Sequence, residues 1–144
     1  MTALRTNLLL IFLIVLDLVL SAVCLFFPEV WFRLFHNAPY IDPQGLLRRM
    51  GAVWAAFTLF QLIALLRWRR QPYWLPLVAG IRLTETFSDW VYLCVAESIT
   101  WFGVVGLLSA PPANVLFAWL LLRAYRKQTV GGIHPGDSQP YGPY

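Results

Sequence analysis

Apolar residues fall in three long runs, each able to cross a lipid bilayer as a helix. They cover about residues 4–27, 46–68 and 73–95, and roughly 20 residues of helix span a hydrocarbon core. Pro28 ends the first run because proline lacks the amide that would continue a helix. The Gln71–Pro72 link is so short that the second and third runs should lie antiparallel and adjacent.

The last third of the chain has a more interrupted pattern. Residues 98–109 are apolar but too short to span a bilayer, and two prolines separate them from a further apolar run. We expect an interfacial or re-entrant segment followed by a fourth helix over residues 112–127. A single proline-kinked helix over residues 99–127 is the alternative.

The remaining segments are polar or rich in helix breakers. After Pro28, we expect a short interfacial helix that places Trp31, Phe32 and Phe35 among the lipid headgroups. Residues 128–144 are rich in glycine and proline and should form an extended cytoplasmic tail. The predicted fold is therefore an all-α membrane protein, a four-transmembrane-helix bundle over residues 1–127.

Composition and charge support a membrane location. The chain is 59% hydrophobic and 12% charged, whereas about a quarter of the residues of a soluble domain are charged. Most basic residues fall on one side of the predicted bundle: Arg5, Arg67, Arg69, Arg70, Arg123, Arg126 and Lys127. The positive-inside rule makes that side, and both termini, cytoplasmic in a bacterial inner membrane, although Arg33, Arg48 and Arg49 oppose it.

The third run carries a stripe of polar residues. At 100° per residue, a sector of roughly 80° holds Arg82, Glu85, Asp89 and Tyr92. A charge at the bilayer centre costs about 2.5–3.5 kcal/mol, so such residues usually face a protein interior. Asp17 should lie at the same depth, and Arg82 can pair with it or with Glu85.

Three carboxyl groups near one arginine leave an excess of negative charge. Either one acid is protonated, or Arg48 or Arg49 reaches toward Asp89. The intramembrane polar cluster of Asp17, Arg82, Glu85, Asp89 and Tyr92 has three interpretations: it fixes helix register, it lines a pocket for an amphipathic or cationic ligand, or it carries protons or ions.

Smaller signals concern packing and chemistry. Gly51, Ala52 and Ala55 form a small-residue surface suited to close packing against the third helix or a partner. Cys24 and Cys94 should sit at similar depth, as free thiols or, alternatively, as a disulfide. No cysteine or histidine spacing indicates a metal site, and we expect His36 and His134 to be solvated.

Three segments resemble the DoxX-like group of small four-helix bacterial membrane proteins. They are the first helix ending in Pro-Glu, the second opening with GLLRRMGAVWAA, and the third carrying RLTETFSDWVYL. The resemblance covers about residues 8–127 and rests on an Arg-x-x-Gly helix start with an arginine and an aspartate in the third helix. It implies no catalytic residue; some members are linked to quinone or thiosulfate oxidation complexes.

These features predict a protein that is not an enzyme, because no nucleophile with a base, phosphate loop or metal cluster is present. The favoured function is a non-catalytic accessory or scaffolding subunit of a larger membrane complex, such as one of photosynthetic or respiratory electron transport. Tyr141 and Tyr144 in the tail would bind the partner, and a lipid, quinone or pigment could contact the helix surface. The alternative is a stand-alone protein that binds a lipid, quinone or sterol-like molecule in an intramembrane acidic pocket.

Overall fold

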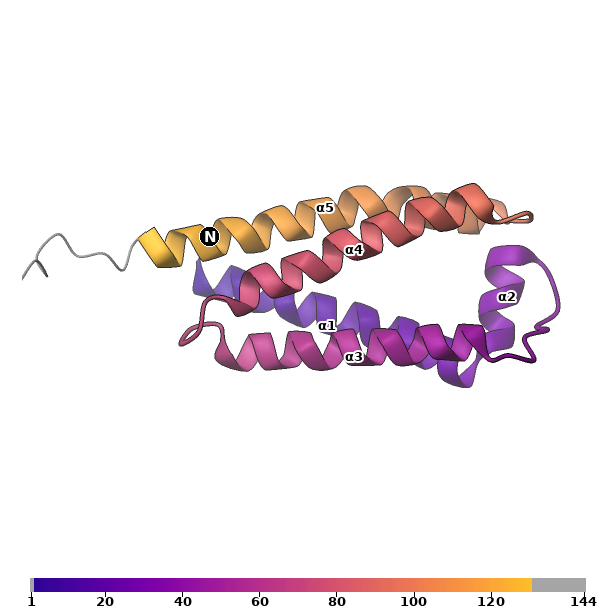
Figure 1. Cartoon of the computed structure of the whole chain (residues 1–144), viewed down its shortest axis with the longest axis horizontal. Coiled ribbons are helices and arrows are strands. Elements are labelled where there is room, and N and C mark those ends of the chain that lie inside the picture. Colours follow the sequence, from indigo (N-terminus) through magenta and orange to yellow (C-terminus); the bar gives the residue numbers. More distant parts are fainter. Residues whose placement is uncertain (1, 131–144) are drawn as a thin grey trace, which may run out of the picture.

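The computed structural model describes residues 2–130, and in this range the chain forms five helices (Figure 1). They are α1 (Ala3–Phe26), α2 (Pro28–His36), α3 (Leu46–Arg67), α4 (Trp74–Val95) and α5 (Trp101–Val130). Three of the expected helices therefore have almost the predicted bounds, and the short helix after Phe27 is confirmed. His134, Tyr141 and Tyr144 lie outside the described residues.

The four long helices form two layers, with α1 packed along α3 and α4 packed along α5 (Figure 1). Gly51 allows the first pairing, because a Cβ atom there would lie 2.9 Å from the Leu25 Cγ atom and 3.1 Å from the Cys24 Cβ atom. The close approach is therefore to α1, not to the third predicted helix, while Ala52 and Ala55 are exposed. The short α3–α4 link joins the layers without making these helices the main packing partners.

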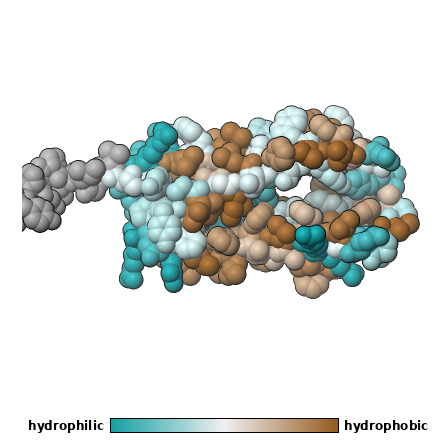
Figure 2. Space-filling view, viewed as in Figure 1, coloured by the Kyte–Doolittle hydropathy of each residue, from teal (hydrophilic) through white to brown (hydrophobic). Residues whose placement is uncertain are grey.

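Both described chain ends and the α3–α4 link lie at one end of the bundle, and α2 and the α4–α5 turn lie at the other (Figure 1). The first end, here called the basic end, holds Arg5, Arg67, Arg69, Arg70, Arg123, Arg126 and Lys127. Figure 2 shows an apolar band between two hydrophilic ends. Three helices, α1, α3 and α5, are long and apolar enough to cross a membrane, which indicates a membrane protein.

Helix α5 corrects the prediction for the last third of the chain. One continuous helix runs from Trp101 to Val130 and includes Pro111 and Pro112, so the re-entrant segment and the separate helix over residues 112–127 are wrong. Prolines are tolerated in a membrane helix when neighbouring helices pack around them. Here Pro111 is fully buried, and the Thr86 hydroxyl of α4 lies 3.5 Å from its carbonyl oxygen. Residues 128–130 belong to this helix instead of the tail.

Asp42 defines where α3 begins. Its carboxylate oxygens accept hydrogen bonds from the Leu46 and Leu47 amides, each at 2.9 Å, and these amides have no partner within the helix. The hydrogen bonds that the backbone amides of Leu47 and Leu46 donate hold the pKa of the Asp42 carboxyl group below its ordinary value. The loop between α2 and α3 thus ends in a fixed turn, in which Gly45 adopts a positive φ of 69°.

The main cluster of the hydrophobic core occupies the half of the bundle nearer the basic end. It consists of Leu10, Leu13, Ala64, Trp68, Leu75, Val78, Ala79, Ala118, Leu121 and Ala124. In the other half the two layers diverge, and α2 lies between their ends (Figure 1). Figure 2 shows an opening between the layers there. We call it the interlayer opening.

Candidate functional site

Arg82 is the centre of the polar cluster and is only 1% exposed. Its Nη1 atom donates to the Asp17 Oδ1 atom at 3.1 Å, and its Nη2 atom pairs with Asp17 Oδ2. The same guanidinium contacts the Glu85 Oε2 atom at 2.8 Å, one turn along α4. The two pairings that the sequence offered as alternatives therefore form together, and the fork-like contact with Asp17 is the strong, bidentate kind.

Two side chains of α3 complete the cluster, and sequence analysis did not assign them to it. The Gln61 amide donates to Asp17 Oδ2 at 2.6 Å, and the Trp54 indole donates to Glu85 Oε1 at 2.8 Å. Gln61 is fully buried. The sequence does contain a signal for this role, because Gln61 is a polar residue within an apolar run. It lies two turns after Trp54 and therefore on the same helix face. The cluster thus ties α1, α3 and α4 together at one level.

Asp89 lies one turn beyond Glu85 on the same face of α4, away from the basic end. Asp89 is partly exposed, and no ion pair or side-chain hydrogen bond within residues 2–130 involves it. Arg48 and Arg49 are exposed and form no ion pair in that range, so the expected reach toward Asp89 is not observed. The Glu85 side chain is 14% exposed. Both oxygen atoms of Glu85 therefore have partners, whereas the Asp89 carboxyl group has none among the described residues.

Tyr92 and His36 form a separate contact at the α2 end. The Tyr92 hydroxyl lies 2.6 Å from His36 Nε2, and His36 Nδ1 lies 2.5 Å from the Ser98 carbonyl oxygen. A carbonyl can only accept, so Nδ1 carries the hydrogen and Nε2 of the neutral ring accepts from the tyrosine. The expectation that His36 is solvated is wrong, and Tyr92 does not join the Arg82 group. This histidine links α2, α4 and the α4–α5 turn.

Aromatic side chains of α2 bridge the two layers. The Trp31 ring lies 5.6 Å from Trp54 on α3 and stacks on Phe35 at 4.2 Å. Phe35 in turn contacts Phe102 of α5, with ring centroids 5.5 Å apart. Trp31 and Phe35 are thus held by other helices, whereas the sequence placed them among headgroups. Helix α2 therefore covers the end of the bundle opposite the basic end. Its aromatic contacts run from Trp54, the hydrogen-bond donor to Glu85, through Trp31 and Phe35 to Phe102.

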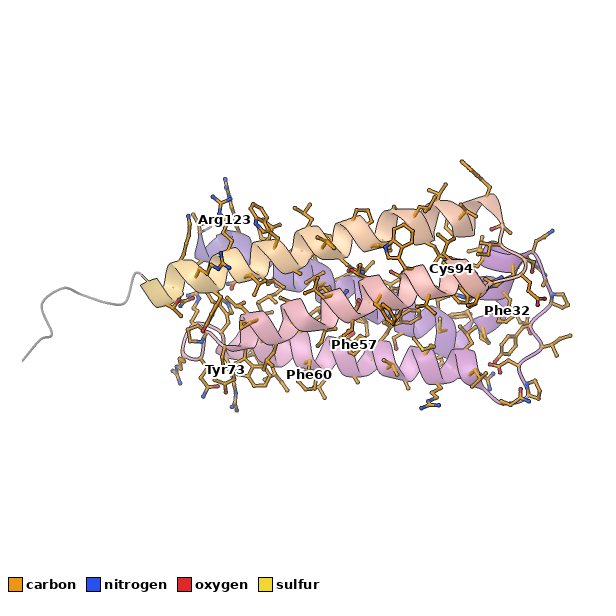
Figure 3. All side chains as sticks on the ribbon, turned by 45° about the horizontal axis from the view of Figure 1, so that its top comes forward. Phe32, Phe57, Phe60, Tyr73, Cys94 and Arg123 are labelled. Atoms are coloured by element: carbon orange, nitrogen blue, oxygen red, sulfur yellow. The ribbon has the colours of Figure 1, made fainter. Side chains whose placement is uncertain are left out.

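The two cysteines form no disulfide with each other. Both thiols are free: Cys24 is buried between α1 and α3, whereas Cys94 of α4 is exposed (Figure 3). Within residues 2–130, no group of histidine, cysteine, aspartate and glutamate side chains could hold a metal ion.

Comparisons with protein-family models, with curated proteins and with solved structures found no match for this chain. The resemblance to the DoxX-like group therefore stays a prediction.

Proposed function

We propose that the protein is a non-catalytic, multi-pass protein of a bacterial inner membrane that binds a hydrophobic molecule with a cationic head group. The binding site is the interlayer opening beside Glu85 and Asp89. The observation that carries this proposal is that one half of the bundle has a packed core, whereas in the other half the layers diverge and the partly exposed Asp89 carboxyl group has no partner among the described residues. The tail, which favoured an accessory subunit, lies outside the described residues.

In this proposal α4 also crosses the membrane, so that both termini are cytoplasmic. Helix α4 has 22 residues, the same length as α3. It packs along α5, which is long enough to cross a membrane. Its three charged residues share one helix face, on which Arg82 is buried, while its outer surface exposes Leu77, Leu83 and Phe87. A helix with this arrangement can cross a bilayer because its charges are kept away from the acyl chains.

Charge complementarity supports a cationic head group. Asp17, Glu85 and Asp89 supply three carboxyl groups, whereas Arg82 is the single basic residue of the cluster. The Trp54 indole donates a hydrogen bond to Glu85, and the Trp31 ring lies 5.6 Å from the Trp54 ring. Aromatic faces attract cations and pack against apolar chains. The site therefore offers negative charge and aromatic surface in one place.

The proposal can be tested with two probes of equal chain length, dodecylammonium and neutral dodecanol. The purified protein in lipid nanodiscs should bind the ammonium at least about tenfold more tightly, because only the cation gains charge pairing. The Glu85→Gln/Asp89→Asn variant should lose this preference, measured through tryptophan fluorescence. The control Glu97→Gln removes a carboxyl group from the exposed α4–α5 turn. This control should keep the preference for the ammonium probe. Equal binding of both probes by the unmodified protein would refute the proposal.

A second candidate function, the accessory subunit of a membrane complex, is favoured by the outer face of α4. Gly80, Thr84 and Ser88 recur every four residues and are exposed, and a Cβ atom at Gly80 would meet nothing within 4 Å. The two hydroxyl groups donate to carbonyl oxygens of their own helix. Such small-residue surfaces let another membrane helix approach closely.

Extraction in mild detergent separates the two functions. A subunit should elute within a large complex, and Gly80→Leu should release it as a small particle because the side chain blocks close helix approach. Ser109→Leu, an exposed position on α5, is the matched control. Elution of the unmodified protein as a small particle would count against the subunit function and leave the ligand-binding function in place.

A further inference from the structure

A groove separates α1 from α5 at the basic end, where these two helices make little contact. Its volume is about 490 Å³, and it is lined by Thr2, Arg5, Leu9, Leu120, Arg123 and Lys127. A smaller hollow of about 300 Å³ adjoins it on α5 and shares Arg123. Figure 3 labels Arg123 at the end of α5 that lies near the start of α1. The groove therefore lies at the other end of the molecule from the interlayer opening.

The lining carries positive charge without a compensating acid. Arg5, Arg123 and Lys127 contribute three cationic groups, and no aspartate or glutamate lines the groove. Within residues 2–130, none of the three forms an ion pair. The Arg123 guanidinium instead lies 5.3 Å from the centre of the Trp119 ring, and tryptophan at this level is typical of the membrane interface. The groove is thus suited to an anion.

The order of the lining residues distinguishes an amphipathic anion from a soluble one. Leu9 lies one turn beyond Arg5 toward the middle of the bundle, and Leu120 lies about one turn before Arg123 in the same direction. Cationic groups therefore surround the mouth, and apolar side chains form the wall facing the bilayer centre. A phosphate group at the mouth would leave its acyl chains beside the leucines.

We propose that this groove binds one anionic phospholipid of the adjacent leaflet, with its phosphate group held between Arg5 of α1 and Arg123 and Lys127 of α5. Basic residues near a membrane surface attract anionic headgroups. The bound lipid fills space between α1 and α5, which belong to different layers. It therefore strengthens the connection between the layers at the basic end. This site is independent of the proposed ligand site.

The test compares phosphatidylglycerol, phosphatidylcholine and inorganic phosphate added to the delipidated protein in mild detergent. Phosphatidylglycerol should be retained in native mass spectra and raise the thermal unfolding midpoint. Phosphatidylcholine should bind about tenfold or more weakly, because its headgroup has no net charge. Equal effects of both lipids would overturn the proposal, and an equal effect of inorganic phosphate would overturn the lipid assignment.

Variants locate the site. Arg5→Gln/Arg123→Gln/Lys127→Gln should weaken phosphatidylglycerol binding by about tenfold or more. The control Arg67→Gln/Arg69→Gln/Arg70→Gln removes the same number of charges from exposed positions at the same end but outside the groove. This control should retain the lipid. Equal losses in both variants would show that only the overall charge of the basic end matters and would overturn the groove as the site.

Discussion

Replacing Arg82 with methionine is expected to destabilise the protein by about 3–5 kcal/mol, the usual cost of removing one partner of a buried ion pair. Asp17 is fully buried, so its carboxylate would lose its countercharge without gaining water. Glu85 would lose the same partner. The free energy of unfolding, measured by denaturant titration in detergent with circular dichroism, gives the size of the effect.

A second substitution separates charge from packing. Adding Asp17→Asn to Arg82→Met removes the orphaned charge but keeps an oxygen that can accept the Gln61 hydrogen bond. We expect the double variant to recover about half of the lost stability, because an uncompensated buried charge is the main cost. Arg48→Met, at an exposed position without an ion pair in the described residues, should change stability by less than about 0.5 kcal/mol. A loss below about 1 kcal/mol in Arg82→Met would contradict the structural role of the cluster.

Gly103→Ala is the second change with a large expected effect. The added Cβ atom would lie 2.6 Å from the Ile99 Cγ2 atom and 2.9 Å from the Phe35 carbonyl oxygen. That oxygen already accepts a hydrogen bond from the Thr100 amide at 2.7 Å, so a shift would break this contact between α2 and the turn that precedes α5. Overpacking of this kind costs about 1–3 kcal/mol, and thermal unfolding in detergent measures it.

Gly106→Ala is the matched control for this prediction. Gly106 faces the same phenylalanine from the next turn of α5, but its Cβ atom would lie 3.6 Å from the nearest ring atom, an ordinary contact. Alanine also favours a helix over glycine by up to about 1 kcal/mol, so this variant should be neutral or more stable. Equal effects at Gly103 and Gly106 would show that α2 is not held tightly against α5.

The two halves of the bundle have different physical roles. The half near the basic end holds the packed apolar core, and the Arg82 cluster lies at its boundary. Beyond that boundary, α2 joins the layers through Trp31 and Phe35, and through His36. A ligand in the interlayer opening would therefore contact the partly exposed Asp89 carboxyl group without disturbing the core.

The sequence alone determined the bounds of α1, α3 and α4 and the polar face of α4. A bilayer offers no water to an unpaired backbone group, so long apolar runs have to be helical. This constraint placed α1, α3 and α4 within about two residues of their observed bounds. Helical periodicity alone put Arg82, Glu85 and Asp89 on one face of α4.

Only the tertiary structure decided which helices pair and which partners each polar side chain has. Pairing depends on close approach, as at Gly51 against α1, and periodicity does not say which neighbour a face meets. A continuous α5 was only the alternative prediction, because the effect of Pro111 depends on its burial against α4. Gln61, Trp54 and His36 were missed for the same reason: each finds its partner on another helix or turn, many residues away in the chain.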